Sequence, residues 1–311
     1  MDIQRRHAAY LISSTLVASC LCIAAKPASA QTEATDLQRP VAMAVHEGSG
    51  HAFIVEAGSG RLLRWDGEKT EVIVQDLRSE PAKLDEIQSV TFHNGNKVTV
   101  VGTLTEDRSK RIRFATFEVV LEQPTRFVET YSGDMPLGEG EEFAAFTSTD
   151  LALYLATNSE SASHLYRLEP TRAQNEQLKS LFTDLSATIT ALTIDRDGHI
   201  VAAVNEPDAL SQLRFHHGLS GKQLLLVPTD AKGISSLSFS TERLLYGSCS
   251  KDGQRGVYRF DAFLEGGRQK ARAVQVEAVD KALSILCTEH PEGIVLVGGE
   301  QDGKVLRRRL D

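Results

Sequence analysis

A strand-like pattern that returns six times, at intervals of 45 to 56 residues, constrains this chain more than any other feature. The six copies begin at Pro40, Ile87, Phe143, Ile189, Ile234 and Ala282. The third residue of every copy is small: Ala42, Ser89, Ala145, Ala191, Ser236 and Ser284. A period in the forties with strand-like patterning is typical of propeller blades and not of helical solenoids.

The fourth residue of each copy is larger and apolar: Met43, Val90, Phe146, Leu192, Leu237 and Ile285. Alternate residues of a strand face opposite sides, so one face is crowded and the other packs a hydrophobic layer. The innermost strand of a blade has this requirement, because blades converge toward the axis. The pattern therefore predicts an all-β fold, a six-bladed β-propeller formed as a single domain by residues 31–311.

The first copy, Pro40–Asp66, indicates three strands over residues 41–45, 52–56 and 61–65, with glycine-rich turns between them. The second copy is irregular, with an expected loop over 103–110 and a long exit over 122–140. The chain ends at Asp311, directly after the third strand of the last copy, which leaves a sheet edge open. We predict that the segment Gln31–Leu37 supplies the missing strand and closes the ring.

The first thirty residues have the pattern of a secretory signal peptide. Arg5 and Arg6 precede an apolar run over 8–25, and Ala28-Ser29-Ala30 is a suitable cleavage site. We expect cleavage near Ala30 and export to the periplasm or the extracellular space as a soluble protein. Lipidation at Cys20 is the alternative. No later apolar run reaches the roughly 18 residues of a membrane span.

The formal net charge of −8 argues against nucleic acid or an anionic membrane as a partner, since both require clustered Lys and Arg. We expect a monomer. Two cysteines remain after the signal peptide, Cys249 and Cys287. They either form a disulfide, which requires Cα atoms within about 7 Å, or stay as two buried thiols.

The first copy, AVHEGSGHAFIVEAGSGRLLRWD, looks like an NHL-type repeat, whereas the glycine-rich segments 247–253 and 298–303 are closer to WD-type repeats. In size, the ring is similar to NHL and gluconolactonase-like propellers. The resemblance implies an architecture shared by binding proteins and some enzymes, so a function does not follow from it. The chain departs from the gluconolactonase-like pattern because it contains no convincing set of the acidic and amide metal ligands of those enzymes.

Asp, Glu and Asn recur in the loops that enter the units and in the loops between second and third strands. Both loop sets open on one end of a propeller, which predicts an acidic end at the channel mouth. The candidate metal ligands there are Glu142, Asn158, Asn205 and Asp252, and a hard cation such as calcium suits such oxygen ligands. The alternative is that these residues cap turns through their own backbone. No catalytic residue and no cofactor is assigned.

Two functional hypotheses follow. The first is a non-enzymatic exported propeller that binds a protein or glycan partner at the acidic channel end. The alternative is a metal-dependent lactonase or hydrolase of the gluconolactonase-like class, in which an ion at the channel mouth polarises a carbonyl.

Overall fold

The structure is a computed structural model that describes most of the chain after residue 30. The described residues are 31–46, 48–93, 95–106, 109–119, 126–169, 178–184, 187–206, 209–240, 242–279, 282–289, 292–298 and 305–308. For residues 31–33, 126–136, 178, 282–289, 292–298 and 305–308, the structure describes only the backbone. The predicted signal peptide over residues 1–30, including Cys20, lies outside the described residues.

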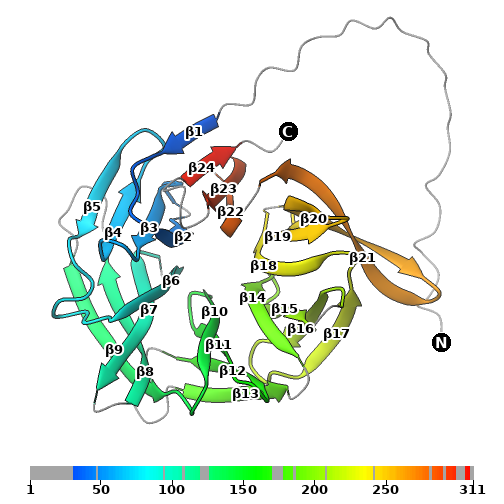
Figure 1. Cartoon of the computed structure of the whole chain (residues 1–311), viewed down its shortest axis with the longest axis horizontal. Helices are drawn as coiled ribbons and strands as arrows, with labels where there is room; N and C mark the ends of the chain where they lie inside the picture. Colours follow the sequence, from blue (N-terminus) through cyan, green and yellow to red (C-terminus); the bar gives the residue numbers. More distant parts are fainter. Residues whose placement is uncertain are drawn as a thin grey trace, which may run out of the picture.

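Within the described residues, the strands form six four-stranded sheets arranged around a central axis (Figure 1). Sheet 1 contains β2 (Pro40–Val45), β3 (Ala52–Glu56), β4 (Arg61–Trp65) and β5 (Thr70–Val74). Sheet 2 contains β6 (Glu86–His93), β7 (Lys97–Glu106), β8 (Ser109–Glu118) and β9 (Arg126–Pro136). Sheet 3 contains β10 (Glu142–Ser148), β11 (Leu153–Asn158), β12 (Ser163–Leu168) and β13 (Leu178–Asp184).

Sheet 4 contains β14 (Thr188–Ile194), β15 (His199–Asn205), β16 (Gln212–His217) and β17 (Gln223–Pro228). Sheet 5 contains β18 (Lys232–Phe239), β19 (Leu245–Lys251), β20 (Gln254–Glu265) and β21 (Arg268–Ala278). Sheet 6 contains β22 (Ala282–Glu289), β23 (Glu292–Gly298), β24 (Val305–Arg308) and β1 (Gln31–Ala34). The predicted all-β propeller fold is confirmed. In the part of the chain that the structure describes, no helix is long and apolar enough to cross a bilayer.

Sheet 6 combines the two ends of the described chain. Its outer strand is β1, which pairs antiparallel with β24 from Gln31 opposite Arg308 to Ala34 opposite Val305. Its inner strand, β22, lies beside β18 of sheet 5 and β2 of sheet 1. The N-terminal strand therefore covers the edge that β24 would otherwise expose.

The inner strand of every sheet carries the same irregularity at the same place in the repeat. Pairing with the second strand shifts register between Pro40 and Ala42 in β2, and between Ile189 and Ala191 in β14. The strands β6, β10 and β22 shift at the equivalent position, and in β18 the shift covers a longer stretch, between Lys232 and Ser236. Such a bulge bends the strand and increases its twist locally. It recurs where the chain enters each sheet, beside the end of the second strand.

The small and large positions of the repeat complement each other across neighbouring sheets. Ala145 of sheet 3 packs in one buried cluster with Leu192 of sheet 4. Ala191 of sheet 4 packs with Leu237 of sheet 5 in the same way. Near the axis the sheets converge, so a small side chain on one inner strand makes room for the larger one on the next. This packing explains the periodicity of the sequence.

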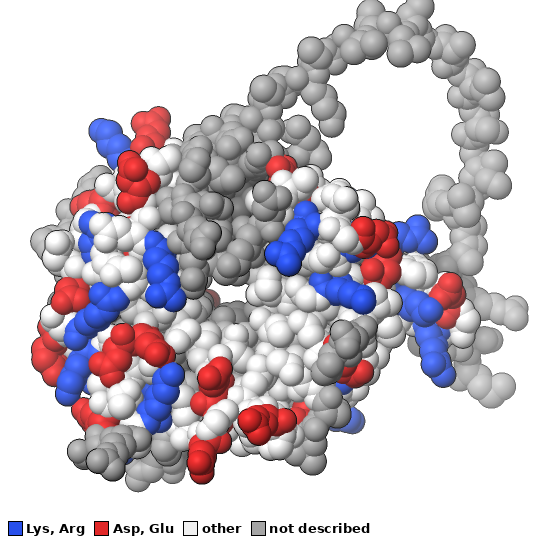
Figure 2. Space-filling model, viewed as in Figure 1, with Lys and Arg blue, Asp and Glu red and all other residues white. Residues whose placement is uncertain are grey.

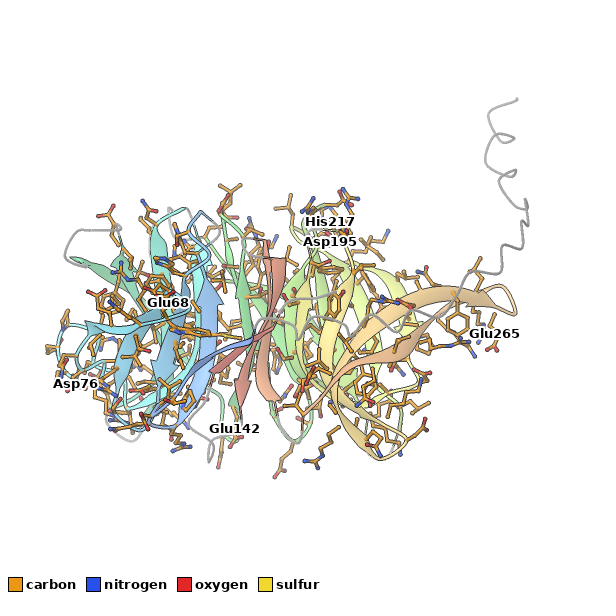
Figure 3. All side chains as sticks on the ribbon, turned by 90° about the horizontal axis from the view of Figure 1, so that it is seen from above. Glu68, Asp76, Glu142, Asp195, His217 and Glu265 are labelled. Atoms are coloured by element: carbon orange, nitrogen blue, oxygen red, sulfur yellow. The ribbon has the colours of Figure 1, made fainter. Side chains whose placement is uncertain are left out.

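Two segments differ from the sequence-based expectation. In sheet 2, the expected loop over 103–110 belongs to a long hairpin of β7 and β8, and the expected exit over 122–140 contains the strand β9. In sheet 5, β20 is the longest strand among the described residues, and it extends outward with β21 as a two-stranded ribbon (Figures 1 and 3). The guanidinium of Arg272 lies 5.3 Å from the ring centroid of Phe263 on this ribbon, a favourable cation–π distance.

Candidate functional site

The four predicted metal ligands share one end of the propeller. Glu142 begins β10, Asn158 ends β11, Asn205 ends β15, and Asp252 lies in the turn between β19 and β20. Figure 3 shows Glu142 at the lower end of the disc and Asp195 and His217 at the upper end. Glu142 also pairs with Asn158 across β10 and β11. The four residues therefore lie at the same end of the propeller, as their places in the repeat predict. Lying at one end does not by itself bring them together around one ion.

The Asn158 side chain forms hydrogen bonds that join sheets 3 and 4. Its Nδ2 donates to the carbonyl of Ile189 at 2.8 Å. Its Oδ1 accepts from Ser163 Oγ at 2.6 Å and from the Ile189 amide at 3.2 Å. An amide oxygen has two lone pairs, and these two bonds use both of them. Asn158 thus fastens the end of β11 to the bulge of the next inner strand.

Asn205 has the equivalent role between sheets 4 and 5. Its Nδ2 lies 2.9 Å from Thr190 Oγ1 and 3.4 Å from the carbonyl of Ile234. Its Oδ1 accepts from Ser211 Oγ at 2.5 Å. Thr190 is the bulged residue of β14, and its own hydroxyl donates to the Ile234 carbonyl. The asparagine at the end of the second strand therefore joins Ser211, Thr190 and the Ile234 carbonyl in one hydrogen-bonded network between the two sheets.

The remaining two predicted ligands are exposed to solvent. Asp252 has a φ of 52°, a left-handed conformation that Asp tolerates better than most residues, so its position in the turn agrees with the turn reading. A cation held by all four residues would require Asn158 and Asn205 to give up the bonds that join the sheets. The residues do not fit a calcium site in this arrangement.

The carboxylates at this end are matched by cations. Glu56, which is fully buried, forms an ion pair with Arg61 at 2.8 Å. Asp184 pairs with Arg214 of the next sheet, and Asp230 pairs with Lys251 at 2.7 Å. Figure 2 shows Lys and Arg interspersed with Asp and Glu on the face turned to the reader. The predicted acidic end is therefore mixed in charge over the residues that the structure describes.

Asp230 illustrates the balance at this end. Partial burial opposes its ionisation most strongly. The amide of Ala273 and the ammonium of Lys251 outweigh that effect, so the pKa of Asp230 is lowered. Asp230 is thus an ionised structural group and not a general acid.

The opposite end carries a cluster that sequence reasoning missed. Asp195, Asp197 and His199 offer ligand atoms within 4.8 Å of one another, the one such His, Cys and acidic group among the described residues. Asp195 Oδ1 accepts from the amides of Asp197 and His199 at 2.9 and 2.8 Å. Its Oδ2 lies 2.9 Å from His199 Nδ1. Because these bonds shape the turn between β14 and β15, the cluster is explained without a metal.

Cys249 is a free thiol, buried in the core of sheet 5. Burial, with a smaller effect of the Asp230 charge, raises the pKa of this thiol to about 12. The thiol stays protonated at neutral pH and is a poor nucleophile. Cys287 is the cysteine with which Cys249 would pair in the disulfide that the sequence allows, and its side chain lies outside the described residues.

Comparison with known proteins supports the β-propeller fold. No family model and no curated protein matches the chain. Among solved structures, it is similar to a luciferin-regenerating enzyme (9% identity, 90% of this chain and 95% of that one, TM-score 0.63). It is also similar to a gluconolactonase from Xanthomonas campestris (12%, 88% and 87%, TM-score 0.56). A third similar structure is a PQQ-bound aldose sugar dehydrogenase from Streptomyces coelicolor (13%, 92% and 100%, TM-score 0.59).

At these identities, the likeness concerns the fold alone. The chain has the architecture of a β-propeller with gluconolactonase-like and sugar-dehydrogenase structural neighbours. One fold of this kind carries many unrelated functions, so activity must be argued from the site.

Proposed function

We propose that this protein is an exported propeller whose six sheets form a ring closed by β1, and that it binds a protein or glycan partner at the channel mouth. One observation supports binding over metal catalysis. The side chains of Asn158 and Asn205 already form hydrogen bonds between neighbouring sheets, so they are not available as metal ligands. Glu142 and Asp252 are exposed at the same end and remain accessible to a partner. Export depends on the signal peptide proposed for residues 1–30.

The second candidate is a lactonase or related hydrolase. The similar structures support it better than they support a binding module, because gluconolactonases and sugar dehydrogenases are among them. The geometry of the four predicted ligands counts against it. A hydrolase on this fold would have to use groups other than Asn158 and Asn205 for its chemistry.

Two measurements on the mature chain separate the two candidates. We expect no opening of D-glucono-1,5-lactone above the spontaneous rate, with calcium, with zinc or with chelator. We also expect that a glycan array finds ligands whose binding is weakened by Glu142→Gln or Asp252→Asn. Metal-dependent turnover that Glu142→Gln abolishes would replace the first candidate with the second. An array without any ligand would contradict glycan binding.

Thermal unfolding with calcium and with chelator tests the assignment of Asn205. We expect Asn205→Ala to lower the free energy of unfolding by about 1–3 kcal/mol in both solutions, because Ser211 and the Ile234 carbonyl lose a buried partner. Asp252→Asn, which keeps a residue tolerant of positive φ, is the matched control and should change little. An ion bound only by the folded state would add about 2.7 kcal/mol at a hundredfold excess over its dissociation constant. A calcium-dependent gain that both variants abolish would show that these residues hold a cation after all.

A further inference from the structure

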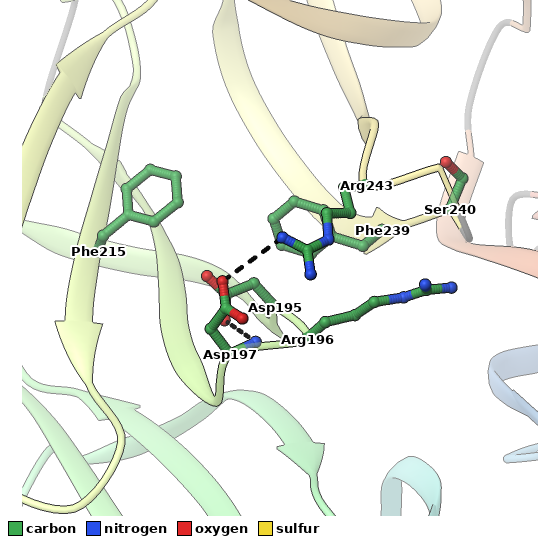
Figure 4. Close-up of a pocket in the computed structure, with 7 residues that line it drawn as sticks. All are labelled: Asp195, Arg196, Asp197, Phe215, Phe239, Ser240 and Arg243. Atoms are coloured by element: carbon green, nitrogen blue, oxygen red, sulfur yellow. Dashed lines mark hydrogen bonds and ion pairs between the residues drawn. The ribbon is translucent and has the colours of Figure 1, made fainter. Parts of the chain in front are cut away.

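A cavity of 170 Å³ lies between sheets 4 and 5 at the end opposite Glu142 (Figures 3 and 4). It is lined by Asp195, Arg196, Asp197, Phe215, Phe239, Ser240 and Arg243. The first three belong to the turn after β14, and the last two to the turn after β18. The cavity is therefore built where two neighbouring hairpin turns face each other. It is separate from the channel-mouth residues.

The two phenylalanines give the cavity preformed apolar walls. Phe215 of β16 and Phe239 of β18 are half-buried and pack against the buried cluster that joins sheets 4 and 5. Figure 4 shows the two rings on either side of the space above Asp195 and Asp197. Because both rings pack against this cluster, their positions are restricted before a ligand binds. Such preorganisation reduces the cost of binding.

The rim of the cavity carries both signs of charge. Asp197 Oδ2 and Arg243 Nη1 are 3.7 Å apart, and the two side chains are 62% and 65% exposed. An exposed pair at this separation contributes little stability, so both groups can exchange partners at little cost. Arg243 is held in a left-handed conformation, with a φ of 64°, by a bond from its amide to the Ser240 carbonyl at 3.0 Å.

The chemistry of this lining selects for a neutral polar ring. Two aspartates and two arginines line the cavity, so the lining carries no net charge and favours neither sign of ligand charge. Carboxylates only accept hydrogen bonds and guanidinium groups only donate them, whereas a hydroxyl does both. A saccharide ring presents hydroxyls at its edge and C–H groups on its faces, which suit the rim and the aromatic walls respectively.

We propose that this cavity binds one ring of a neutral saccharide, between Phe215 and Phe239, with Asp197 and Arg243 bonding its hydroxyls. A cavity of about 150 Å³ accommodates benzene, so this one can take the six-membered ring itself, with the hydroxyls directed to the rim. The proposal stands independently of the function proposed for the channel mouth, because it uses the opposite end of the disc. A free monosaccharide and the terminal unit of a longer glycan present the same chemistry here.

Saturation-transfer NMR on the mature chain tests the proposal, with D-glucose, methyl β-D-glucoside and cellobiose as probes and with gluconate and glucosamine as charged analogues. We expect signals from the neutral sugars and weaker binding of both charged analogues. Tighter binding of cellobiose than of glucose would identify the end of a chain as the ligand. Equal binding would identify the single ring.

Variants assign the signal to the cavity. Arg243→Gly removes the guanidinium and suits the positive φ, so the fold is retained, and it should weaken glucose binding about tenfold. Phe215→Leu should weaken binding comparably while it keeps the core filled. Glu242→Ala, next to Arg243 but outside the lining, is the control and should bind like the parent. Three results would overturn the proposal: no neutral sugar binds, neither cavity variant weakens binding, or only Glu142→Gln abolishes it.

Discussion

Removal of Gln31–Leu37 should lower the melting temperature of the mature chain by about 10 °C or more, or cause it to aggregate. The segment contains β1, which pairs with β24 along its whole length. It also contributes Ala34 and Leu37, both buried in the cluster that contains Trp65. Losing Leu37 alone costs about 2–5 kcal/mol in a packed core. The deletion adds an unpaired edge on β24, which is a template for association.

The control for this deletion is Leu37→Ala, which removes the buried side chain and leaves β1 in place. We expect it to reproduce part of the loss of stability without aggregation. Calorimetry and light scattering on the parent, the substitution and the deletion measure the two effects separately. If the deleted chain melts at the parental temperature and remains monomeric, β1 does not close the ring.

The sequence predicted the fold because the repeat is dictated by packing near the axis. Ala145 and Leu192 come from different sheets, but each recurs at a fixed place in its own unit, so the alternation is visible without a structure. The bulge between Ile189 and Ala191 was not visible, because the bulged Thr190 has no compositional mark. The extended pairing of β20 with β21 was also missed, since its outer part is exposed and lacks the alternation of a buried strand.

The candidate site was harder to predict, because the role of an asparagine at a strand end depends on distant partners. Asn158 bonds to Ile189 and Asn205 bonds to Ile234, in each case about thirty residues further along the chain. The same local sequence is compatible with three roles of the asparagine: it can cap a turn, bind a metal or form hydrogen bonds to the neighbouring sheet. The saccharide cavity could not be foreseen either. Phe215 and Phe239 look like ordinary core residues until two turns are placed side by side.

Acidification from pH 7 to pH 4 should reduce the free energy of unfolding by about 3 kcal/mol through one residue, His93. His93 ends β6 and is 4% exposed. Its Nε2 lies 2.7 Å from Thr99 Oγ1, which in turn lies 2.7 Å from Thr116 Oγ1. Burial, with a smaller effect of the charge of Lys97, lowers the pKa of His93 from 6.5 to about 4.

The direction of the effect follows from the two pKa values. Below pH 6.5 the unfolded chain binds a proton that folded His93 does not, so stability falls until the pH reaches the folded value near 4. Burial also lowers the pKa of His216, which acts in the same direction. Carboxylates such as Asp66, whose pKa is lowered by the amides of Lys69 and Glu68, lose their contribution only at lower pH. Glu86, whose pKa is lowered from 4.5 chiefly by the ammonium of Lys110, starts to lose its contribution below about pH 5. The window between pH 5 and 6.5 therefore reports mainly on the buried histidines.

Urea unfolding at several pH values between 7.0 and 4.5 measures this effect directly. His93→Gln keeps a group that can bond to Thr99 but cannot titrate in this range, so its stability should vary less with pH, by up to about 1.4 kcal/mol per pH unit. His217→Gln, at an exposed histidine, is the matched control and should follow the parental profile. If His93→Gln loses stability on acidification as steeply as the parent does, His93 is not the group that makes this propeller sensitive to acid. In that case His216, stacked on Phe182 at 4.2 Å, is the next histidine to replace.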